Sequence, residues 1–281
     1  MKSIFETRKP ENQDLSPFIA YYYFHQSTKD SGAERFTYYP HVKNALTVYK
    51  DSKIEIKDSF TTSASPSSKG YTYNYTNLIS HFAQAELNPP FDKIGIVFQP
   101  LGLNHFVKMN LSKLITQTFN LNLNPFSLHI QKTLDQVYST ESFTEKTALL
   151  DHYFQQIFTD FTDEKMKKAM GLVLAEDADY TVQSLADQLE ISRKTLLRMF
   201  NRHLNCSVKD YLRVIKFRKA VDHFQSSNKN SRLTDLAYDM DYNDQSEFIH
   251  HFKKLTGFSP KPFFKNLEPL SNQGTYWSKK K

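Results

Sequence analysis

The sequence predicts an α+β multidomain protein, with a β-rich N-terminal domain that also carries helices and an all-helical C-terminal domain. Its 281 residues, 39% of them hydrophobic, suffice for two separate cores. After about Leu111 the hydrophobic period changes from two to between three and four. Charge changes too: 15 Lys and Arg stand against 16 Asp and Glu in residues 1–163, but 21 against 14 in residues 164–281. The whole excess of positive charge, +6 for the chain, therefore lies in the C-terminal part, which indicates a polyanionic partner such as nucleic acid or a solvated basic surface.

The first hundred residues predict short strands separated by turns. Residues 44–49, 52–58 and 93–100 are rich in β-branched or aromatic side chains, and some alternate apolar with polar. Segments rich in Ser, Pro, Asn and Gly, such as residues 61–70 and 87–90, predict the turns between them. This pattern is typical of a small barrel or sandwich.

A helix is predicted over residues 142–161, where apolar residues form one broad stripe. We expect the stripe to face the core, with a dimer surface as the alternative. Aromatic density falls and charge rises near residues 159–164. We therefore predict a first domain over residues 1–162, β-rich to about 108 and helical after, then a helical domain over 163–270 and a basic tail over 271–281.

The helical part contains an internal repeat, because residues 182–204 resemble residues 233–260. Leu185, Ala186 and Leu189 correspond to Leu236, Ala237 and Met240. With one extra residue in the second turn, the correspondence continues through Leu196, Arg198, Phe200, Ser207 and Tyr211, which match Phe248, His250, Phe252, Ser259 and Phe263. The sequence thus contains two copies of one supersecondary unit.

Each unit predicts two short helices joined by a tight turn. Thr181 caps the first helix of the first unit and Ser192 the second, whose Leu196 and Phe200 point back to a shared core. Two such helices at a steep angle form a helix-turn-helix, here expected at about residues 181–203 and 233–256. The second helix leaves its outer face free to enter a major groove of DNA. Helix pairs in ordinary bundles give the same pattern once, but two copies in one basic domain favour DNA binding.

The outer helix faces supply the candidate contacts to DNA. Arg and Lys suit guanine edges or phosphates, Gln suits adenine, and Glu accepts from cytosine. The candidates that face bases are Arg193, Lys194, Leu197, Arg198, Gln245, Ser246, Glu247 and His250. The candidates for phosphate contacts are Arg202, Arg213, Lys216, Arg218, Lys253 and Lys261.

Between the two units, residues 207–224 predict a long helix. Ser207 and Asp210 have the spacing of a capping box, and apolar residues line one face of the helix. Such a rod would set the distance between the two reading helices, which must lie about 34 Å apart to enter the same face of one duplex.

Residues 165–267 resemble the DNA-binding domain of AraC/XylS-type bacterial transcription regulators. The most specific stretch is "FKKLTGFSPKPFF", with Phe252, Gly257, Ser259 and Pro260 where that family's pattern places them. The chain departs from the family where Glu190, Asp241 and Asn205 replace usual glycines. Glu tolerates a left-handed backbone poorly, so we expect these turns to be kept at some cost in stability. His250 stands where Arg is common, which predicts weaker or pH-dependent binding by the second unit.

The resemblance implies a regulator whose N-terminal domain senses an effector or mediates dimerisation ahead of the DNA-binding domain. The partners it implies are double-stranded promoter DNA, an unidentified small-molecule effector, a second copy of the chain and RNA polymerase. It names no effector. The alternative is a cupin-like small-molecule-binding protein or enzyme, in which the helical domain serves only for association.

Other chemistry has little support in the sequence. No His-x-His, Gly-rich phosphate loop or G-x-S-x-G occurs, so no catalytic residue, metal or cofactor is expected. The single Cys206 excludes an internal disulfide, and neither an apolar run near ~18 residues nor a signal-peptide pattern occurs, which together predict a cytoplasmic protein. The aromatic runs 21–24 and 71–75 are expected in the core of the barrel, with the lining of a ligand pocket as the alternative.

Overall fold

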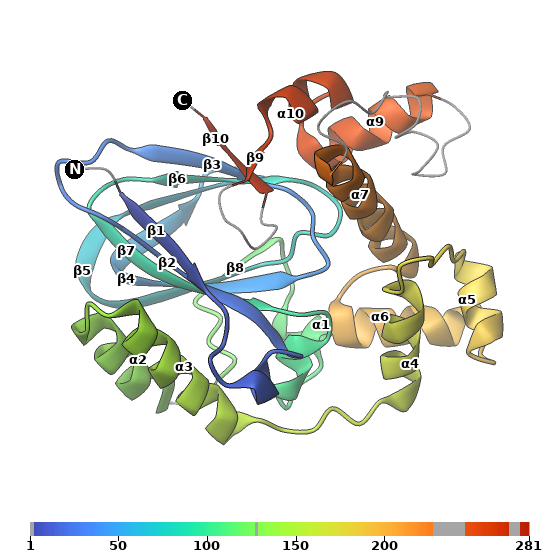
Figure 1. Ribbon diagram of the computed structural model, residues 1–281, viewed down its shortest axis with the longest axis horizontal. Coiled ribbons are helices and arrows are strands. Elements are labelled where there is room, and N and C mark those ends of the chain that lie inside the picture. The colour runs from blue at the N-terminus through green and yellow to red at the C-terminus, as the bar shows by residue number, and fades with distance from the viewer. Residues whose placement is uncertain (1–2, 127–128, 227–244, 270–275, 281) are drawn as a thin grey trace.

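A computed structural model describes residues 3–126, 129–226, 245–269 and 276–280. It consists of a strongly curved sheet flanked by helices, followed by a group of helices at one end of that sheet (Figure 1). The N-terminal strands are β1 (Ile4–Arg8), β2 (Ile19–Ser27), β3 (Glu34–Tyr38), β4 (Asn44–Ile56), β5 (Thr61–Thr76), β6 (Ala83–Leu87), β7 (Phe91–Phe98) and β8 (Phe119–Leu121). The 3-10 helix η1 (Gln13–Leu15) lies between β1 and β2, and η2 (Gly102–His105) and the short helix α1 (Leu111–Leu114) lie between β7 and β8. The expected barrel or sandwich is thus a single curved sheet in the order β1-β2-β7-β4-β5-β6-β3, with β8 paired to β5.

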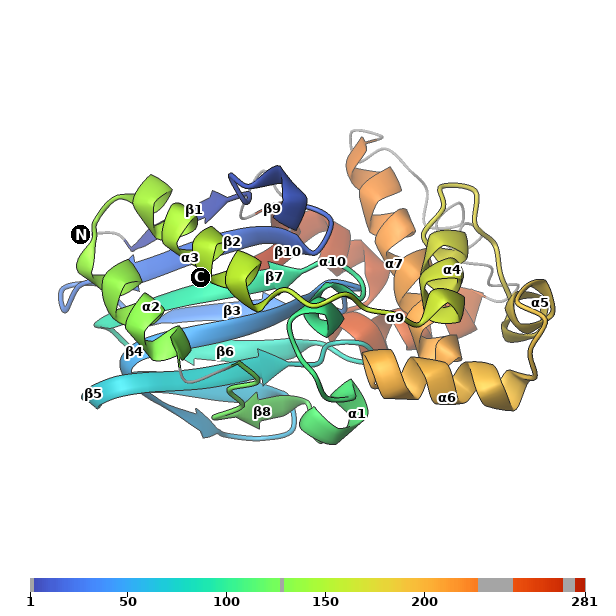
Figure 2. The ribbon, with the colours of Figure 1, turned by 90° about the horizontal axis from the view of Figure 1, so that it is seen from below.

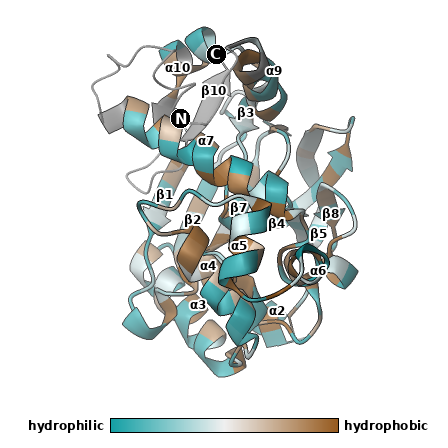
Figure 3. Cartoon of the chain, turned by 90° about the vertical axis from the view of Figure 1, so that its right-hand side faces the viewer, coloured by the Kyte–Doolittle hydropathy of each residue, from teal (hydrophilic) through white to brown (hydrophobic). Residues whose placement is uncertain are grey.

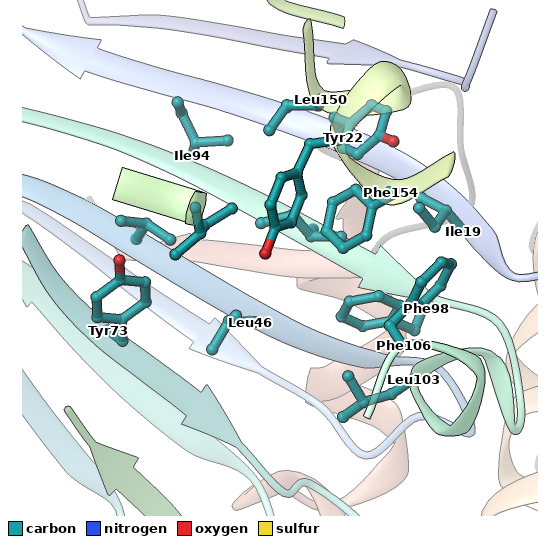
Figure 4. Close-up of a cluster of buried hydrophobic side chains, with 14 of the residues drawn as sticks. Ile19, Tyr22, Leu46, Tyr73, Ile94, Phe98, Leu103, Phe106, Leu150 and Phe154 are labelled. Carbon is teal, nitrogen blue, oxygen red and sulfur yellow. The ribbon is translucent and has the colours of Figure 1, made fainter. Parts of the chain in front are cut away.

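Helices α2 (His129–Ser139) and α3 (Phe143–Ile157) cover the outer face of this sheet (Figure 2). Their Leu134, Leu150 and Phe154 are fully buried against residues of the central strands, including Tyr22, Leu46 and Ile94 (Figure 4). At ~25 cal/mol per Å² of buried apolar surface, this layer is a main source of stability for the first domain. The apolar stripe of residues 142–161 accordingly lies mainly in the core, as expected from the sequence.

The aromatic runs serve both faces of the sheet. Successive residues of a strand point to opposite faces, so Tyr22 and Phe24 join the core under the helices, while Tyr21 and Tyr23 point to the concave face. The concave face carries its own buried cluster, with Phe36, Tyr49 and Val97 among its members. Within residues 21–24, Tyr22 and Phe24 therefore lie in the core under the helices, whereas Tyr21 and Tyr23 line a cavity on the concave face.

The helical part contains α4 (Glu164–Val173), α5 (Val182–Gln188), α6 (Arg193–Leu204), α7 (Val208–Ser226), α9 (Gln245–Thr256) and α10 (Pro260–Asn266). It has two cores. One gathers around Leu185, Leu196 and Phe200, the other around Phe217, Phe248 and Phe252. Helix α7 contributes to both, because Val214 and Ile215 lie in the first core and Phe217 and Val221 in the second.

The predicted basic tail, residues 271–281, contains a short strand. Strand β10 (Tyr276–Lys280) pairs antiparallel with β3, Trp277 opposite Tyr38 and Lys280 opposite Arg35, and also pairs with the short β9 (Glu268–Pro269). The chain therefore returns from the helical part to the edge of the N-terminal sheet. Tyr276 and Trp277 favour a strand, Lys279 and Lys280 do so less, and the edge of β3 supplies the backbone partners that β10 pairs with.

Among the described residues, no helix is long and apolar enough to cross a membrane.

Candidate nucleic-acid interface

The first predicted helix-turn-helix is present, built from α5 and α6. Thr181 caps α5 through a full capping box, since its Oγ1 accepts from the Ser184 amide at 3.0 Å and its own amide donates to Ser184 Oγ at 2.9 Å. Ser192 caps α6 by accepting from the amide of Thr195 at 3.1 Å. Both caps predicted from the sequence are confirmed, and they set where each helix begins.

The turn between these helices requires a left-handed residue. Glu190, with φ 54°, occupies that position, for which glycine is the least strained residue. The turn closes with hydrogen bonds from the amide of Glu190 to the carbonyl of Asp187 and from that of Ile191 to that of Ala186, each 3.0 Å. The turn therefore keeps its hydrogen bonds with a non-glycine residue, and the cost is strain in the backbone of Glu190.

Helix α6 has a buried side and an exposed basic side. Leu196, Phe200 and Leu204 are buried against α5 and Tyr211 of α7. On the opposite side Arg193, Lys194, Leu197 and Arg198 are all exposed, Leu197 to 48%. Arg193, Lys194 and Arg198 make no ion pair within the described residues. Figure 3 shows the side of the molecule that carries α5 and α6. The four predicted base-facing residues of the first unit thus share one solvent-facing surface.

The second unit is described only from α9 onward. Its predicted first helix, and the turn with Asp241, lie outside the described residues. Phe248 and Phe252 of α9 are buried, as the repeat predicted, while Ser246 and His250 are exposed. The side chains of Gln245 and Glu247 lie outside the described ones. Pro260 stands at the first turn of α10 after Ser259, although the hydroxyl of Ser259 makes no capping hydrogen bond.

Five of the six predicted phosphate-contacting residues divide into two groups. Arg202, Lys253 and Lys261 are exposed and near the two reading helices in sequence. Arg213 is half-buried near Asp210, at 3.7 Å, and Lys216 pairs with Asp179 at 3.0 Å. These last two already have acidic partners, which a phosphate would have to replace.

Arg218 does not fit its predicted role. Its side chain is buried, with Nε donating to the carbonyl of Pro40 at 2.5 Å and Nη2 to that of Tyr39 at 2.8 Å. It lies on the side of α7 that faces the N-terminal sheet, whereas a phosphate contact needs a side chain that reaches the surface. Sequence periodicity shows which side of a helix is apolar, but not which domain covers the rest.

The N-terminal domain also contacts the end of α6. Asn205, with φ 52°, ends that helix, donates from Nδ2 to the carbonyl of Ile115 at 2.8 Å and accepts at its own carbonyl from Asn77 at 3.3 Å. Asn104 donates to the carbonyl of His203 at 3.2 Å. The side chain of Asn205 thus makes an interdomain hydrogen bond, which the sequence did not reveal.

His203 joins the linker before α4 to the reading helix. Its Nε2 lies 3.0 Å from Oδ2 of Asp163, the residue that also caps α4. Burial lowers the pKa of His203 below its usual value, although Asp163 opposes this. The contact is therefore mainly a hydrogen bond from a neutral imidazole.

A cavity opens on the concave face of the N-terminal sheet, where it meets α7. Its volume is ≈ 90 Å³, on a scale on which one water molecule needs roughly 10–15 Å³. Its lining includes tyrosines of β2, β3 and β4, the polar Thr47 and Asn74, and the basic His41, Lys43 and Arg218. The side chain of Arg218 therefore lies at a cavity shared by the two domains.

The described residues also bear on metal binding and on the chemistry of the cysteine. Within the described ranges, no group of three or more His, Cys, Asp or Glu is placed to hold a metal ion. Burial raises the pKa of Cys206 well above its usual value, which leaves it a poor nucleophile.

Comparison with known proteins identifies the helical domain. Residues 185–266 match the model of a helix-turn-helix domain family. No curated protein matches the chain. Similar solved structures include ToxT of Vibrio cholerae O395, with 13% identity, a TM-score of 0.43, and 93% of this chain and 97% of that chain covered. They also include unsaturated fatty acid bound ToxT of Vibrio cholerae strain SCE256, at 14% identity and TM-score 0.42, with 83% of this chain and 94% of that chain covered. The C-terminal domain of AraT, a response regulator from Geobacillus stearothermophilus, is 24% identical with a TM-score of 0.35, and the match covers 40% of this chain and 93% of that chain. Together with the doubled motif and the fold of α5 and α6, the family match shows a helix-turn-helix domain within residues 185–266, the region whose sequence resembles the AraC/XylS-type DNA-binding domain.

Proposed function

We propose that the protein is a sequence-specific transcription regulator that uses α6 and α9 to read one stretch of duplex DNA. The observation that carries the proposal is the outer side of α6, where Arg193, Lys194 and Arg198 stand exposed beside Leu197. An apolar side chain at 48% exposure between cations suits a groove, where it can contact a thymine methyl group while the cations reach base edges or phosphates.

In this proposal the second unit reads DNA with a less basic surface. Ser246 and His250 are exposed on α9, and Gln245 and Glu247 share that helix. Arg202, Lys253 and Lys261 would hold phosphates on either side, whereas Arg218 would serve the domain interface. Binding by both units to one duplex supports a longer site than either could specify alone.

The N-terminal domain would regulate this binding. Its cavity meets α7, and its loops hold the end of α6 through Asn77, Asn104 and Ile115. An effector that binds one arrangement of the domains better than another would shift promoter occupancy. A second copy of the chain and RNA polymerase are the further partners of this proposal, and the cytoplasm is the compartment where it would operate.

The test is DNA binding by the full chain. Purified protein is mixed with fragments of its own genome at several salt concentrations, and fragments retained at high salt are sequenced. We expect specific fragments to remain after bulk DNA dissociates, because phosphate contacts weaken steeply with salt while base contacts do so less. Loss of every fragment even at low salt would contradict the proposal.

Arg198→Ala tests the reading surface itself. If Arg198 reads a base, the variant loses about 1–3 kcal/mol on a retained fragment and little on random DNA. Arg35→Ala is the matched control, since Arg35 is exposed on β3 of the other domain. Equal losses of binding free energy on specific and random DNA would mean that Arg198 contacts only phosphate.

A further inference from the structure

One segment of the N-terminal domain lies directly beside the first reading helix. Helix α1 packs against α6 at its C-terminal end (Figures 1 and 2). Two hydrogen bonds hold this arrangement, because Asn205 donates to the carbonyl of Ile115 at 2.8 Å and Asn104 donates to that of His203 at 3.2 Å. Residues 108–113, which include most of α1, lie between these two contacts in sequence and are called the α1 segment below. The position of the α1 segment relative to α6 is therefore fixed on both sides.

A groove opens between the α1 segment and α6. It is lined by Asn110 and Ser112 of the segment and by Arg198 and Arg202 of α6, among others, and its volume is ≈ 510 Å³. One water molecule needs roughly 10–15 Å³ on this scale, so the groove has room for a stretch of sugar and phosphate. No acidic side chain lines the groove among the described residues. Its amide, hydroxyl and guanidinium groups are of the kinds that contact phosphate oxygens in protein–DNA complexes.

The α1 segment differs in charge from the rest of its domain. Residues 1–163 carry 15 Lys and Arg against 16 Asp and Glu, yet no Asp or Glu occurs in residues 93–134. Within the segment Lys108 and Lys113 are exposed, and neither makes an ion pair among the described residues. Each lies one or two residues from a side chain that lines the groove. The segment therefore adds positive charge next to the basic side of α6.

The N-terminal domain flanks the reading surface of α6 without covering it. In the whole chain Arg193, Lys194 and Arg198 are exposed, and Leu197 is 48% exposed. The first residues of the second helix in a helix-turn-helix contact base edges, so the other end of that helix lies toward the DNA backbone. The α1 segment packs at that other end. A duplex that accepts α6 accordingly brings its sugar–phosphate backbone close to the α1 segment.

We propose that the N-terminal domain takes part in DNA binding through the α1 segment, with Lys108 and Lys113 contacting phosphates beside the half-site that α6 reads. Asn110 and Ser112 donate hydrogen bonds to the same strand, and Arg202 holds it from the other side of the groove. Such contacts add affinity and fix the orientation of the N-terminal domain on the duplex, but they carry no sequence information. This inference rests on the proposed DNA-binding function.

The salt dependence of DNA binding by the full chain tests the two lysines. The double variant Lys108→Gln/Lys113→Gln should bind a retained genomic fragment and random DNA more weakly by the same factor, because phosphate contacts do not depend on sequence. Each lost phosphate contact lowers the slope of log K against log salt by about 0.9, so the fold-loss of affinity between about 50 and 200 mM salt should be roughly twelvefold smaller than for the parent. Circular dichroism confirms that the variant is folded.

The double variant Lys29→Gln/Lys132→Gln is the matched control. It removes the same charge from the same domain, at an exposed loop between β2 and β3 and at an exposed position on α2, which lies away from α6 (Figure 2). Its affinity and salt dependence should equal those of the parent. Equal losses in the two double variants would overturn the proposal, because general charge would then explain them. Tighter binding by Lys108→Gln/Lys113→Gln would also overturn it, since the α1 segment would then keep DNA away from α6.

Site-directed cleavage locates the α1 segment on the duplex. Met109 is 53% exposed, and Cys206 is the only cysteine of the chain, so an iron chelate can be attached to Met109→Cys in a Cys206→Ser background. We expect the chelate to cleave the DNA backbone beside one half of the protected site. The same chelate on Lys132→Cys of α2 should not cleave it. Absence of cleavage from position 109, on a fragment that the labelled chain still binds, would contradict the proposal.

The outcomes separate this inference from the function on which it rests. Retained fragments whose salt dependence is unchanged in Lys108→Gln/Lys113→Gln would leave the regulator intact and overturn only the contact by the α1 segment. Loss of every fragment by the parent chain, even at low salt, would overturn both.

Discussion

Glu190 and Asn205 share a left-handed backbone, which glycine adopts most easily, but only Asn205 has a compensating contact. Asn205 uses its side chain to bind the carbonyl of Ile115, and Asn tolerates this backbone well. Glu190 is exposed and has no such contact among the described residues. The strain at Glu190 is therefore uncompensated in the folded domain.

Glu190→Gly should stabilise the protein. Removing Cβ relieves left-handed strain of about 1–2 kcal/mol, less the extra backbone entropy of glycine, for a net gain of roughly 0.5–1 kcal/mol. Urea denaturation monitored by circular dichroism measures it. Asn205→Gly is the comparison, because it relieves little strain and removes the hydrogen bond to Ile115, so a gain there would contradict this account.

Some features of single residues could be predicted from the sequence, and others could not. The caps at Thr181 and Ser192 were predictable because capping depends on neighbours a few residues away. The burial of Arg218 was not, because its partners Tyr39 and Pro40 lie almost 180 residues earlier. The burial of Lys93 was equally unpredictable, because no local pattern reveals which strands enclose it. The alternation of β7 points its side chain to the concave face, where burial lowers the pKa of Lys93 to about 7.

Among the elements, α7 joins two separate cores. Its first half packs with α5 and α6, and its second half packs with α9 and α10. The sequence predicted this helix and its Ser207–Asp210 cap, and the hydroxyl of Ser207 accepts from the Asp210 amide at 3.1 Å. Helices with strong periodicity are predictable in this way, whereas β10 was not, because its pairing depends on the open edge of β3.

Two phenylalanines test the independence of these cores. Phe200 is fully buried in the first core and Phe217 in the second, where it meets the rings of Phe252 and Phe263. Each change to Ala should cost about 3–5 kcal/mol. Hydrogen exchange should accelerate first in α5 and α6 for Phe200→Ala, and first in α9 and α10 for Phe217→Ala. The same pattern in both variants would mean that the two units unfold as one.

At the scale of the molecule, the N-terminal domain holds the helical domain at two places. One is the end of α6, with Asn205 and His203. The other is β3 and the residues that follow it. There Arg218 donates to two backbone carbonyls, and the ring centroids of Tyr39 and Phe263 lie 4.8 Å apart. Strand β10 also extends the sheet by pairing with β3. The two-domain order was predictable from composition and period. The contacts between the two domains were not predictable, because they depend on hydrogen bonds, ring packing and strand pairing between residues far apart in sequence.

Histidines at this interface predict that acid weakens the folded protein. Burial lowers the pKa of His41, His105 and His203, and the backbone carbonyl of His203 accepts a hydrogen bond from Asn104 of the N-terminal domain. A histidine whose folded pKa lies below the unfolded value of about 6.5 binds its proton more readily when unfolded. Its contribution to stability is complete above that value and is lost as the pH falls through it.

His203→Gln should reduce this acid sensitivity. The free energy of unfolding is measured in urea at pH 7.5 and pH 5.5, where the parent protein should be less stable at the lower pH. The variant should show a smaller difference between the two pH values, because one of the three proton-linked groups is gone. His152→Gln is the matched control, since His152 is exposed on α3 and contacts only its neighbour Gln156 among the described residues. A difference that shrinks equally in both variants would place the acid sensitivity outside the domain interface.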